Sequence, residues 1–334
     1  MNGNPLATQP AGPGVITGGA ETLDAGLSAT SLAVRTTGLT KRYGGRAVVD
    51  TIDLAIPTGV VSGFVGPNGA GKTTTLRMLL GLIRPSAGTG QVLGQSITHP
   101  DRYLSRVGAL IEAPAFYPTL SGRRNLDLLA RLGGTDRGRV DSLITQVGLK
   151  GRGDDLFRAY SLGMKQRLGI AAALLPAPDL LVLDEPANGL DPAGIREIRA
   201  LLRNLANGGM TVFVSSHLLS EVETICDHIV VIDRGKLLVQ GDLHALLATQ
   251  RSEIVAAPEF AADAAALCAI ATEEGHQAHV ADGVAHILAP PAWAPELNRR
   301  AMAQGITLAS LGVHGGTLEE AFFSMTAHDG AVAS

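Results

Sequence analysis

The stretch that decides the fold occupies residues 66–73 and reads Gly66-Pro67-Asn68-Gly69-Ala70-Gly71-Lys72-Thr73. It fits the pattern G-x-x-x-x-G-K-[ST]. An apolar run over residues 60–65, typical of a strand, precedes it, and a run typical of a helix follows over residues 74–80. In such a connection successive backbone N–H groups point at one spot, and the helix dipole adds positive potential there. The context therefore predicts a phosphate-binding loop for a nucleoside triphosphate.

The residue types in this loop suit that chemistry. Glycines let the backbone approach the phosphates and adopt positive φ. Lys72 is expected to reach the β- and γ-phosphates, and the Thr73 hydroxyl to hold Mg²⁺. The predicted nucleotide-binding residues are Gly66, Pro67, Asn68, Gly69, Ala70, Gly71, Lys72, Thr73 and Thr74.

The composition excludes several classes of protein. The chain has 334 residues and a formal net charge of −4, which gives no electrostatic case for binding nucleic acid or an anionic membrane surface. Neither Cys226 nor Cys268 belongs to a C-x-x-C pair, so neither a metal site nor a disulfide framework is indicated. The best apolar run, residues 168–183, contains two prolines and an aspartate and is too short to span a bilayer. The N-terminus does not resemble a secretion signal. A role at a membrane would thus require a partner.

Three parts are expected along the chain. Residues 1–31 are rich in Gly, Pro, Ala and Thr without periodicity and predict a disordered tail. Residues 32–241 alternate strands with helices, and their near-continuous apolar strands favour a parallel sheet covered on both faces. Within them, residues 119–175 contain no convincing strand and predict a helical insertion. The expected strands are residues 32–39, 47–56, 60–65, 90–93, 106–111, 180–183, 211–215 and 228–232.

Residues 242–334 show a different pattern and predict a small α+β accessory domain. The expected order is β-α-β-β-α-β, which favours a ferredoxin-like arrangement. Asp282-Gly283 has the composition of a two-residue hairpin turn, and Pro295 suits the first position of a helix. The segment Thr317-Leu318-Glu319-Glu320 fits a capping box for a last helix.

A second motif lies at residues 180–185, where an apolar strand ends in Asp184 and Glu185. We expect the strand's twist to let both carboxylates reach the phosphate crevice. Asp184 would hold Mg²⁺ through its water shell, and Glu185 would take a proton from the attacking water. The alternative is a solvated pair of carboxylates at the end of a strand.

Further motifs surround this strand in a specific order. Tyr160-Ser161-Leu162-Gly163-Met164-Lys165-Gln166-Arg167 precedes it, Asn188-Gly189-Leu190-Asp191 follows it, and His217 comes after the next strand. Together with the glycine loop, this order resembles the ATP-binding subunit of an ABC transporter over residues 32–241. The resemblance implies an α/β P-loop ATPase domain with a mixed sheet and a helical insertion, and ATP and Mg²⁺ as ligands.

The resemblance also implies individual roles. Tyr43 matches the aromatic position that stacks on adenine, although an ordinary aromatic at a strand end would look the same. His217 matches the position that contacts the γ-phosphate and orients the attacking water. Asp191 matches the aspartate of the D-loop. The signature segment would contact the γ-phosphate bound by the opposite subunit, with a simple N-cap as the alternative role for its serine; its residues are Ser161, Leu162, Gly163 and Met164.

Two departures from the commonest family pattern narrow the resemblance. Leu162 stands where glycine is usual, and Glu112 stands where a glutamine normally contacts Mg²⁺. A carboxylate is also an oxygen ligand for a hard cation, so Glu112 is a candidate metal ligand with Thr73 and Asp184. Both departures look like the bacitracin and daunorubicin exporters. That subgroup also has a C-terminal extension ending in a segment like Leu318-Glu319-Glu320-Ala321-Phe322.

The resemblance implies an ATP-hydrolysing subunit of a two-component exporter for an antibiotic or another hydrophobic compound. It would act on the cytoplasmic face of the membrane as a homo- or heterodimer with a separate transmembrane permease. The permease would contact Phe116-Tyr117-Pro118 and the start of the helical insertion, with packing of these aromatics in the core as the alternative. One alternative is a soluble ABC ATPase acting on ribosomes or DNA, but those usually have tandem domains or a long coiled coil. The other is a regulatory module with little hydrolysis, against which Glu185 and His217 argue.

Overall fold

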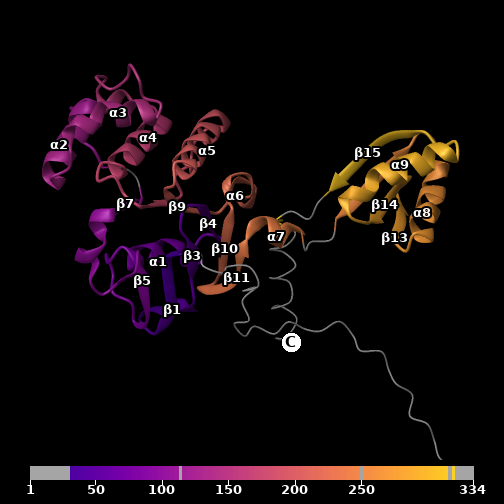
Figure 1. Cartoon of the computed structure of the whole chain (residues 1–334), viewed down its shortest axis with the longest axis horizontal. Helices are drawn as coiled ribbons and strands as arrows, with labels where there is room; N and C mark the ends of the chain where they lie inside the picture. The colour runs from indigo at the N-terminus through magenta and orange to yellow at the C-terminus, as the bar shows by residue number, and fades with distance from the viewer. Residues whose placement is uncertain (1–30, 113–114, 249–251, 315–317, 320–334) are drawn as a thin grey trace, which may run out of the picture. The chain divides into compact units, whose positions relative to one another are not determined.

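The computed structural model describes residues 31–112, 115–248, 252–314 and 318–319, and these form three β-sheets with surrounding helices (Figure 1). Residues 1–30 of the expected N-terminal tail, Thr317 and Glu320 of the expected capping box, and the end of the C-terminal extension lie outside the described residues. Within them, no helix combines the length and the apolar character needed to cross a bilayer.

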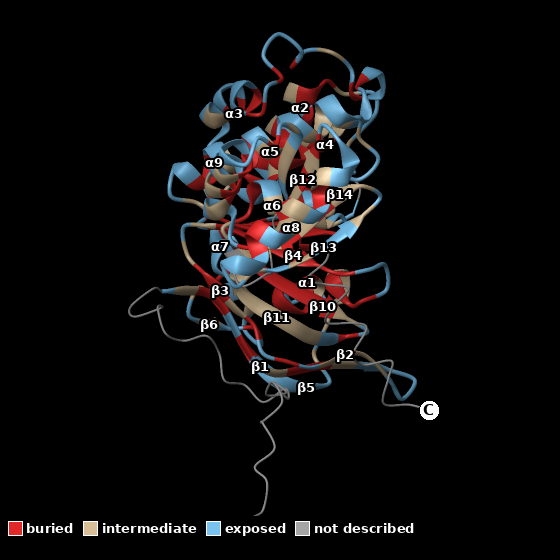
Figure 2. Cartoon of the chain, turned by 90° about the vertical axis from the view of Figure 1, so that its right-hand side faces the viewer, coloured by how far each residue is buried: buried red, intermediate tan, exposed pale blue. Residues whose placement is uncertain are grey.

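A six-stranded sheet forms the centre of the first part of the chain. Its strand order is β11-β10-β4-β9-β8-β7, with every neighbouring pair parallel except β11 and β10. Figure 2 shows its inner strands as buried, which explains their continuous apolar sequences. The carboxyl ends of β4, β8 and β9 meet at one edge, so they bring together the glycine loop, the two carboxylates and His217. The strands are β4 (Val61–Val65), β7 (Val107–Leu110), β8 (Leu180–Asp184), β9 (Thr211–Ser216), β10 (His228–Asp233) and β11 (Lys236–Asp242).

An antiparallel sheet packs against this centre through α1 (Lys72–Leu79). The shared core contains Leu76 of α1 and the rings of Phe64 and Phe213, whose centroids are 5.3 Å apart. The single strand expected over residues 47–56 is two strands, which are separated by residues 53–54. The strands of this sheet are β1 (Leu32–Tyr43), β2 (Arg46–Ile52), β3 (Ala55–Pro57), β5 (Ala87–Val92) and β6 (Gln95–Ser96).

Helices cover the other face of the central sheet and form the insertion. The residues expected to be helical, 119–175, contain α2 (Gly122–Gly133), α3 (Val140–Gln146) and α4 (Leu162–Ala173), and no strand. Helices α5 (Pro192–Asn207) and α6 (Leu219–Ile225) pack on the sheet through one continuous apolar core. Short 3₁₀ turns occupy Pro100–Arg102, Leu104–Arg106, Arg137–Arg139, Phe157–Ala159, Ala261–Asp263 and Pro291–Trp293.

The C-terminal part has its own sheet and its own core. The strand order is β13-β14-β12-β15, and every neighbouring pair is antiparallel. Asp282 and Gly283 form the expected turn with φ values of 50° and 76°. Helices α8 and α9 pack on one face through Leu267 and Leu297. The elements are β12 (Glu253–Pro258), α8 (Ala264–Glu273), β13 (Gln277–Ala281), β14 (Val284–Leu288), α9 (Ala294–Ala303) and β15 (Leu308–His314).

The structure extends the first part beyond the boundary expected after residue 241. Strand β11 continues to Asp242, and Leu243 of α7 (Leu243–Ala248) is buried in the core of the central sheet. Strand β11 itself was not expected from the sequence. The first helix of the C-terminal part begins at Ala264, directly after a 3₁₀ turn.

Candidate nucleotide-binding and hydrolysis site

The glycine loop has a backbone that only glycine allows at two positions. Gly71 caps the N-terminus of α1 with a φ of 104°, and a Cβ atom there would lie 2.7 Å from the carbonyl oxygen of Val48. A Cβ at Gly66 would lie 2.3 Å from the carbonyl oxygen of Ile232. The loop thus turns tightly against its neighbours and leads directly into the N-terminus of α1, where a helix favours an anion.

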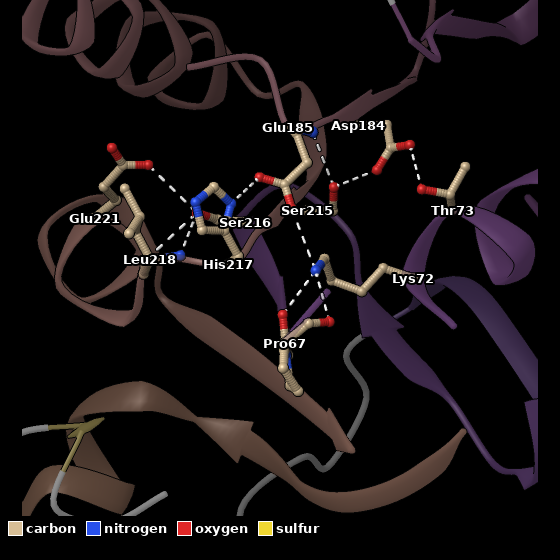
Figure 3. Close-up of polar contacts among 11 residues, drawn as sticks. Pro67, Lys72, Thr73, Asp184, Glu185, Ser215, Ser216, His217, Leu218 and Glu221 are labelled. Carbon is tan, nitrogen blue, oxygen red and sulfur yellow. Dashed lines mark hydrogen bonds and ion pairs between the residues drawn. The ribbon is translucent and has the colours of Figure 1, made fainter. Parts of the chain in front are cut away.

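Lys72 lies across this loop with its ammonium group enclosed. Its side chain is only 6% exposed. The Nζ atom donates to the carbonyl oxygens of Gly66 at 2.7 Å and Pro67 at 3.3 Å, and lies 3.2 Å from Oε1 of Glu185 (Figure 3). These acceptors compensate for the loss of water around the charge.

Asp184 connects the end of β8 to the loop and to β9. Its Oδ2 accepts a hydrogen bond from the Thr73 hydroxyl at 2.7 Å, and its Oδ1 accepts one from the Ser215 hydroxyl at 2.6 Å. Ser215 Oγ in turn accepts from the backbone N–H of Glu185 at 2.9 Å. Ser215 was not among the residues predicted for the site. Its signal in the sequence is slight: it is a hydroxyl residue two positions before His217, near the end of an apolar strand.

Glu185 has a left-handed backbone conformation, with a φ of 50°. This is uncommon for a residue with a side chain, and such strain is frequent at functional sites. The positive φ occurs directly after the end of β8 and interrupts the alternation of side chains along the strand. The carboxylates of Asp184 and Glu185 can therefore both lie beside the glycine loop. The positive φ of Glu185, rather than the strand twist expected from the sequence, accounts for this arrangement. Besides Lys72, the Glu185 carboxylate contacts Nδ1 of His217 at 2.6 Å.

The loop that carries His217 is held by its own hydrogen bonds. Ser216 Oγ accepts from the backbone N–H of Leu218 at 3.0 Å and lies 3.3 Å from a carboxylate oxygen of Glu221 (Figure 3). Glu221 belongs to α6, so this helix fixes the loop and with it the imidazole of His217. Glu221 was not predicted from the sequence.

These groups surround a cavity of about 320 Å³ above the glycine loop. Lys72, Thr73, Glu185 and His217 all line it, and Asn188 lines it as well. A second cavity, of about 630 Å³, continues past the loop toward Arg46 and Arg234. The two cavities offer space for a triphosphate and for a larger group attached to it.

Two predicted site residues lie apart from this cluster. Glu112, with a φ of 66°, forms an ion pair with Arg77 of α1. The Glu112 carboxylate therefore contacts the Arg77 guanidinium, and it does not contact Thr73 or Asp184 in this structure. Tyr43 is 51% exposed at the end of β1, and the Lys41 ammonium lies 5.0 Å from its ring centroid.

The signature and D-loop residues lie at the starts of two helices. Ser161 is the N-cap of α4 and accepts from the backbone N–H of Met164 at 3.3 Å. Asp191 is the N-cap of α5 and accepts from the backbone N–H of Gly194 at 3.0 Å. Leu162, which stands where glycine is usual, is 48% exposed. Ser161 and Asp191 thus cap their own helices within a single chain. Both residues are also exposed, so another molecule can reach these helix starts.

Comparison with known proteins identifies the family. A profile described as ABC transporter matches residues 49–188. The chain is 47% identical over 211 residues to the bacitracin transport ATP-binding protein of Bacillus licheniformis, covering 62% of this chain and 69% of that protein. It is 40% identical over 228 residues to the daunorubicin/doxorubicin resistance ATP-binding protein of Streptomyces peucetius, covering 67% and 69%. An uncharacterized ABC transporter ATP-binding protein of Bacillus subtilis is 36% identical over 293 residues, covering 86% and 94%.

A solved structure agrees with these relatives. The cbiO1 protein from Clostridium perfringens, part of an ABC transporter complex, superposes with a TM-score of 0.59 at 25% identity, covering 65% of this chain and 91% of that one. The chain therefore belongs to the ABC transporter ATP-binding proteins. Members of this class bind ATP, couple its hydrolysis to transport and act at the membrane with permease components. The fold class and the family expected from the sequence are confirmed.

Proposed function

We propose that this chain hydrolyses ATP to drive an exporter of an antibiotic or another hydrophobic compound. The observation that carries the proposal is the single cluster joining Lys72, Thr73, Asp184, Glu185 and His217 at one edge of the sheet. The names of the bacitracin, daunorubicin and lantibiotic relatives support the exporter class.

In this mechanism the side chains exchange partners when ATP binds. The triphosphate offers Lys72 a stronger anionic partner than Glu185, because phosphate oxygens carry more charge than one carboxylate. Glu185 is then free to accept a proton from the attacking water. His217, hydrogen-bonded to Glu185, would contact the γ-phosphate and hold the water in line. Tyr43, exposed at the end of β1, would stack on the adenine.

The residues around Asp184 fit a magnesium ion. Two carboxylates and one ammonium leave the cluster with one net negative charge, and the Thr73 hydroxyl and the Asp184 carboxylate are hard oxygen donors 2.7 Å apart. We propose that both hold Mg²⁺, Asp184 through water. When bound, the ion would neutralise charge on the β- and γ-phosphates. Glu112 would become a Mg²⁺ ligand only if its ion pair with Arg77 broke.

Dimerisation would complete each site. We propose that the helix start carrying Ser161 and Gly163 meets the γ-phosphate bound by a second ATPase subunit, identical or homologous. The half-exposed Leu162 and the N-terminal end of α4 support this role, because the helix dipole places positive potential there, where an anionic phosphate is favoured. Asp191 would lie at the same interface. The formal net charge of −4 gives no electrostatic case for the nucleic-acid partners of the rival hypotheses.

The permease would dock beside the helical insertion. A cavity of about 280 Å³ lies between β7 and the insertion, and Leu110, Phe116, Leu129 and Pro176 line it. The ring of Phe116 packs edge-on against Phe157, at 5.0 Å, whereas Tyr117 is 61% exposed. We propose that Phe116 is a structural wall of this groove and that Tyr117 contacts the permease at the cytoplasmic face of the membrane.

The C-terminal part would form a separate accessory domain of ferredoxin-like topology. The antiparallel order β13-β14-β12-β15, its two helices on one face and its own apolar core support this division. The alignment with the Bacillus subtilis relative extends over this part, so the extension is shared with at least one similar protein.

The test is ATP-dependent resistance in cells. The chain and its membrane subunit would be expressed together in a strain sensitive to bacitracin and daunorubicin. We expect resistance to at least one compound and its loss in Lys72→Ala. The exposed Lys150→Ala is the matched control and should retain resistance. Resistance that survives Lys72→Ala, or Mg²⁺-dependent ATP hydrolysis with no resistance to any exporter substrate, would contradict the exporter proposal.

A further inference from the structure

A further cavity, of about 250 Å³, lies beside the catalytic residues. Glu185 and His217 line it, and no residue of the glycine loop does. Helices α5 and α6 and the segment that follows Glu185 enclose it. Most of its wall is aliphatic and comes from Ile195, Ile198, Leu202, Val214, Val222 and Ile225.

A cation lines this cavity and has no hydrogen-bond or ion-pair partner in the part of the chain that the structure describes. Arg199 of α5 lines it, and the Nε atom is buried and has no hydrogen-bond acceptor among the described residues. The next arginine along the helix behaves differently, since Arg203 pairs with Asp227 at 2.7 Å. A buried N–H donor without an acceptor is unfavourable, so a ligand that supplies an anionic oxygen to Arg199 Nε would be stabilised here.

The carboxylates of this chain that line the cavity already have other partners. Glu221 also lines the cavity and is 9% exposed, but its carboxylate contacts the Ser216 hydroxyl of the loop that carries His217. The Glu185 carboxylate contacts Lys72 and His217. The cavity thus combines an unpaired guanidinium, aliphatic walls and two carboxylates that have other partners.

We propose that this cavity binds a small monocarboxylate with an apolar body. A carboxylate matches the planar donors of the guanidinium of Arg199, and the aliphatic walls would cover the body of the molecule. The carboxylates of Glu185 and Glu221 disfavour more highly charged anions such as phosphates. A single negative charge is therefore the best match.

Such a ligand would regulate hydrolysis. The wall of the cavity includes the backbone of Glu185 and of the residues that follow it. A bound carboxylate would also add negative charge close to Glu185, the residue proposed as the base. It would also fill the space between α6 and the segment after Glu185, which restricts their movement. We expect turnover to fall while ATP still binds, because the glycine loop lies outside this cavity.

Octanoate is a suitable probe, and calorimetric titration of the full chain measures its binding. We expect saturable binding that Arg199→Gln weakens roughly tenfold or more, since a charged hydrogen bond is lost. Arg196→Gln, on an exposed turn of the same helix, is the matched control and should bind like the parent. 1-Octanol, with the same chain and no charge, should bind the parent and Arg199→Gln equally.

Two further measurements keep the test independent of folding and of the assigned base. Arg199→Lys keeps the charge without the planar donors and should bind octanoate with intermediate affinity. Ile195→Trp should fill the cavity and abolish octanoate binding while nucleotide still binds. The proposal is overturned if octanoate does not bind saturably, or if Arg199→Gln and Arg196→Gln bind it equally. Unchanged ATP turnover at saturating octanoate would refute the regulatory role.

Discussion

Glu185 stands between a cation and an imidazole, and this position has a chemical consequence. Its carboxylate contacts Lys72 at 3.2 Å and His217 at 2.6 Å, and its backbone is strained into a positive φ. The strain persists because Ser215 holds the backbone N–H, and because both carboxylate oxygens have partners. A site that fixes one carboxylate this firmly is suited to a directed proton transfer.

Glu185→Gln should therefore reduce turnover by on the order of 10²–10⁴-fold while leaving ATP binding largely intact. The amide keeps the shape and can still hydrogen-bond to His217, but it cannot accept the proton. Steady-state hydrolysis and a nucleotide-binding titration measure the two effects separately. The exposed Glu259→Gln is the control. Hydrolysis by Glu185→Gln at close to the parental rate would show that another group is the base.

Glu112 poses the opposite question, since its partner is Arg77 in this structure. If Glu112 binds Mg²⁺ during the cycle, Glu112→Ala should raise the Mg²⁺ concentration needed for half-maximal hydrolysis. Glu112→Gln should keep the parental value, because an amide oxygen can replace the carboxylate. Arg77→Gln should lower it, because the competing cation is gone. Mg²⁺ titrations that coincide for all three variants would leave Glu112 as an ion-pair partner of Arg77 alone.

Strand β10 carries a buried histidine at its first residue. His228 is buried, and burial lowers its pKa from the ordinary 6.5 to about 4, although Asp242 opposes the shift. The folded chain thus keeps this imidazole neutral, whereas the unfolded chain protonates it below about pH 6.5. Stability should be complete above that pH and fall as the pH drops toward 4, by up to about 3 kcal/mol from this group.

Urea unfolding at pH 7.5 and pH 5 tests this prediction. We expect His228→Gln, which cannot titrate, to lose less stability than the parent between the two pH values. His99→Gln, on an exposed turn, is the control and should follow the parent. Identical losses in the parent and in His228→Gln would mean that His228 is protonated in the folded chain at pH 5.

Elements with a continuous apolar sequence could be predicted, and those defined by their neighbours could not. The strands that end in the glycine loop, the carboxylates and His217 are buried on both faces, so their sequences alone indicate them. Strand β11 is an edge strand with half-buried residues and a glycine, and its apolar run, Leu237-Leu238-Val239, is only three residues long. Ser215, Glu221 and the Glu112–Arg77 pair depend on which elements meet, and a single sequence does not contain that information.

At the scale of the whole molecule, the proposed site needs a second copy. Lys72, Thr73 and Asp184 gather at one edge of the sheet, whereas Ser161 and Gly163 begin α4. The substitution Gly163→Asp tests dimerisation without disturbing the fold of the single chain. A Cβ there meets only Leu190, at an ordinary 3.8 Å, and an acidic residue in the first turn of a helix is favourable. The variant should therefore fold and bind ATP as the parent does.

Across a dimer interface, the new carboxylate would face the γ-phosphate, and repulsion in a poorly hydrated gap should prevent closure. Light scattering of Glu185→Gln with ATP and Mg²⁺ should show dimers, because binding is kept and hydrolysis lost. Adding Gly163→Asp should return the protein to monomers. Gly133→Asp, a glycine of α2 whose added Cβ would also meet a neighbour at 3.8 Å, is the matched control and should leave the dimers intact. Equal dimer populations with and without Gly163→Asp would refute the cross-subunit role of the signature segment, whereas loss of dimers in both variants would trace the effect to added charge alone.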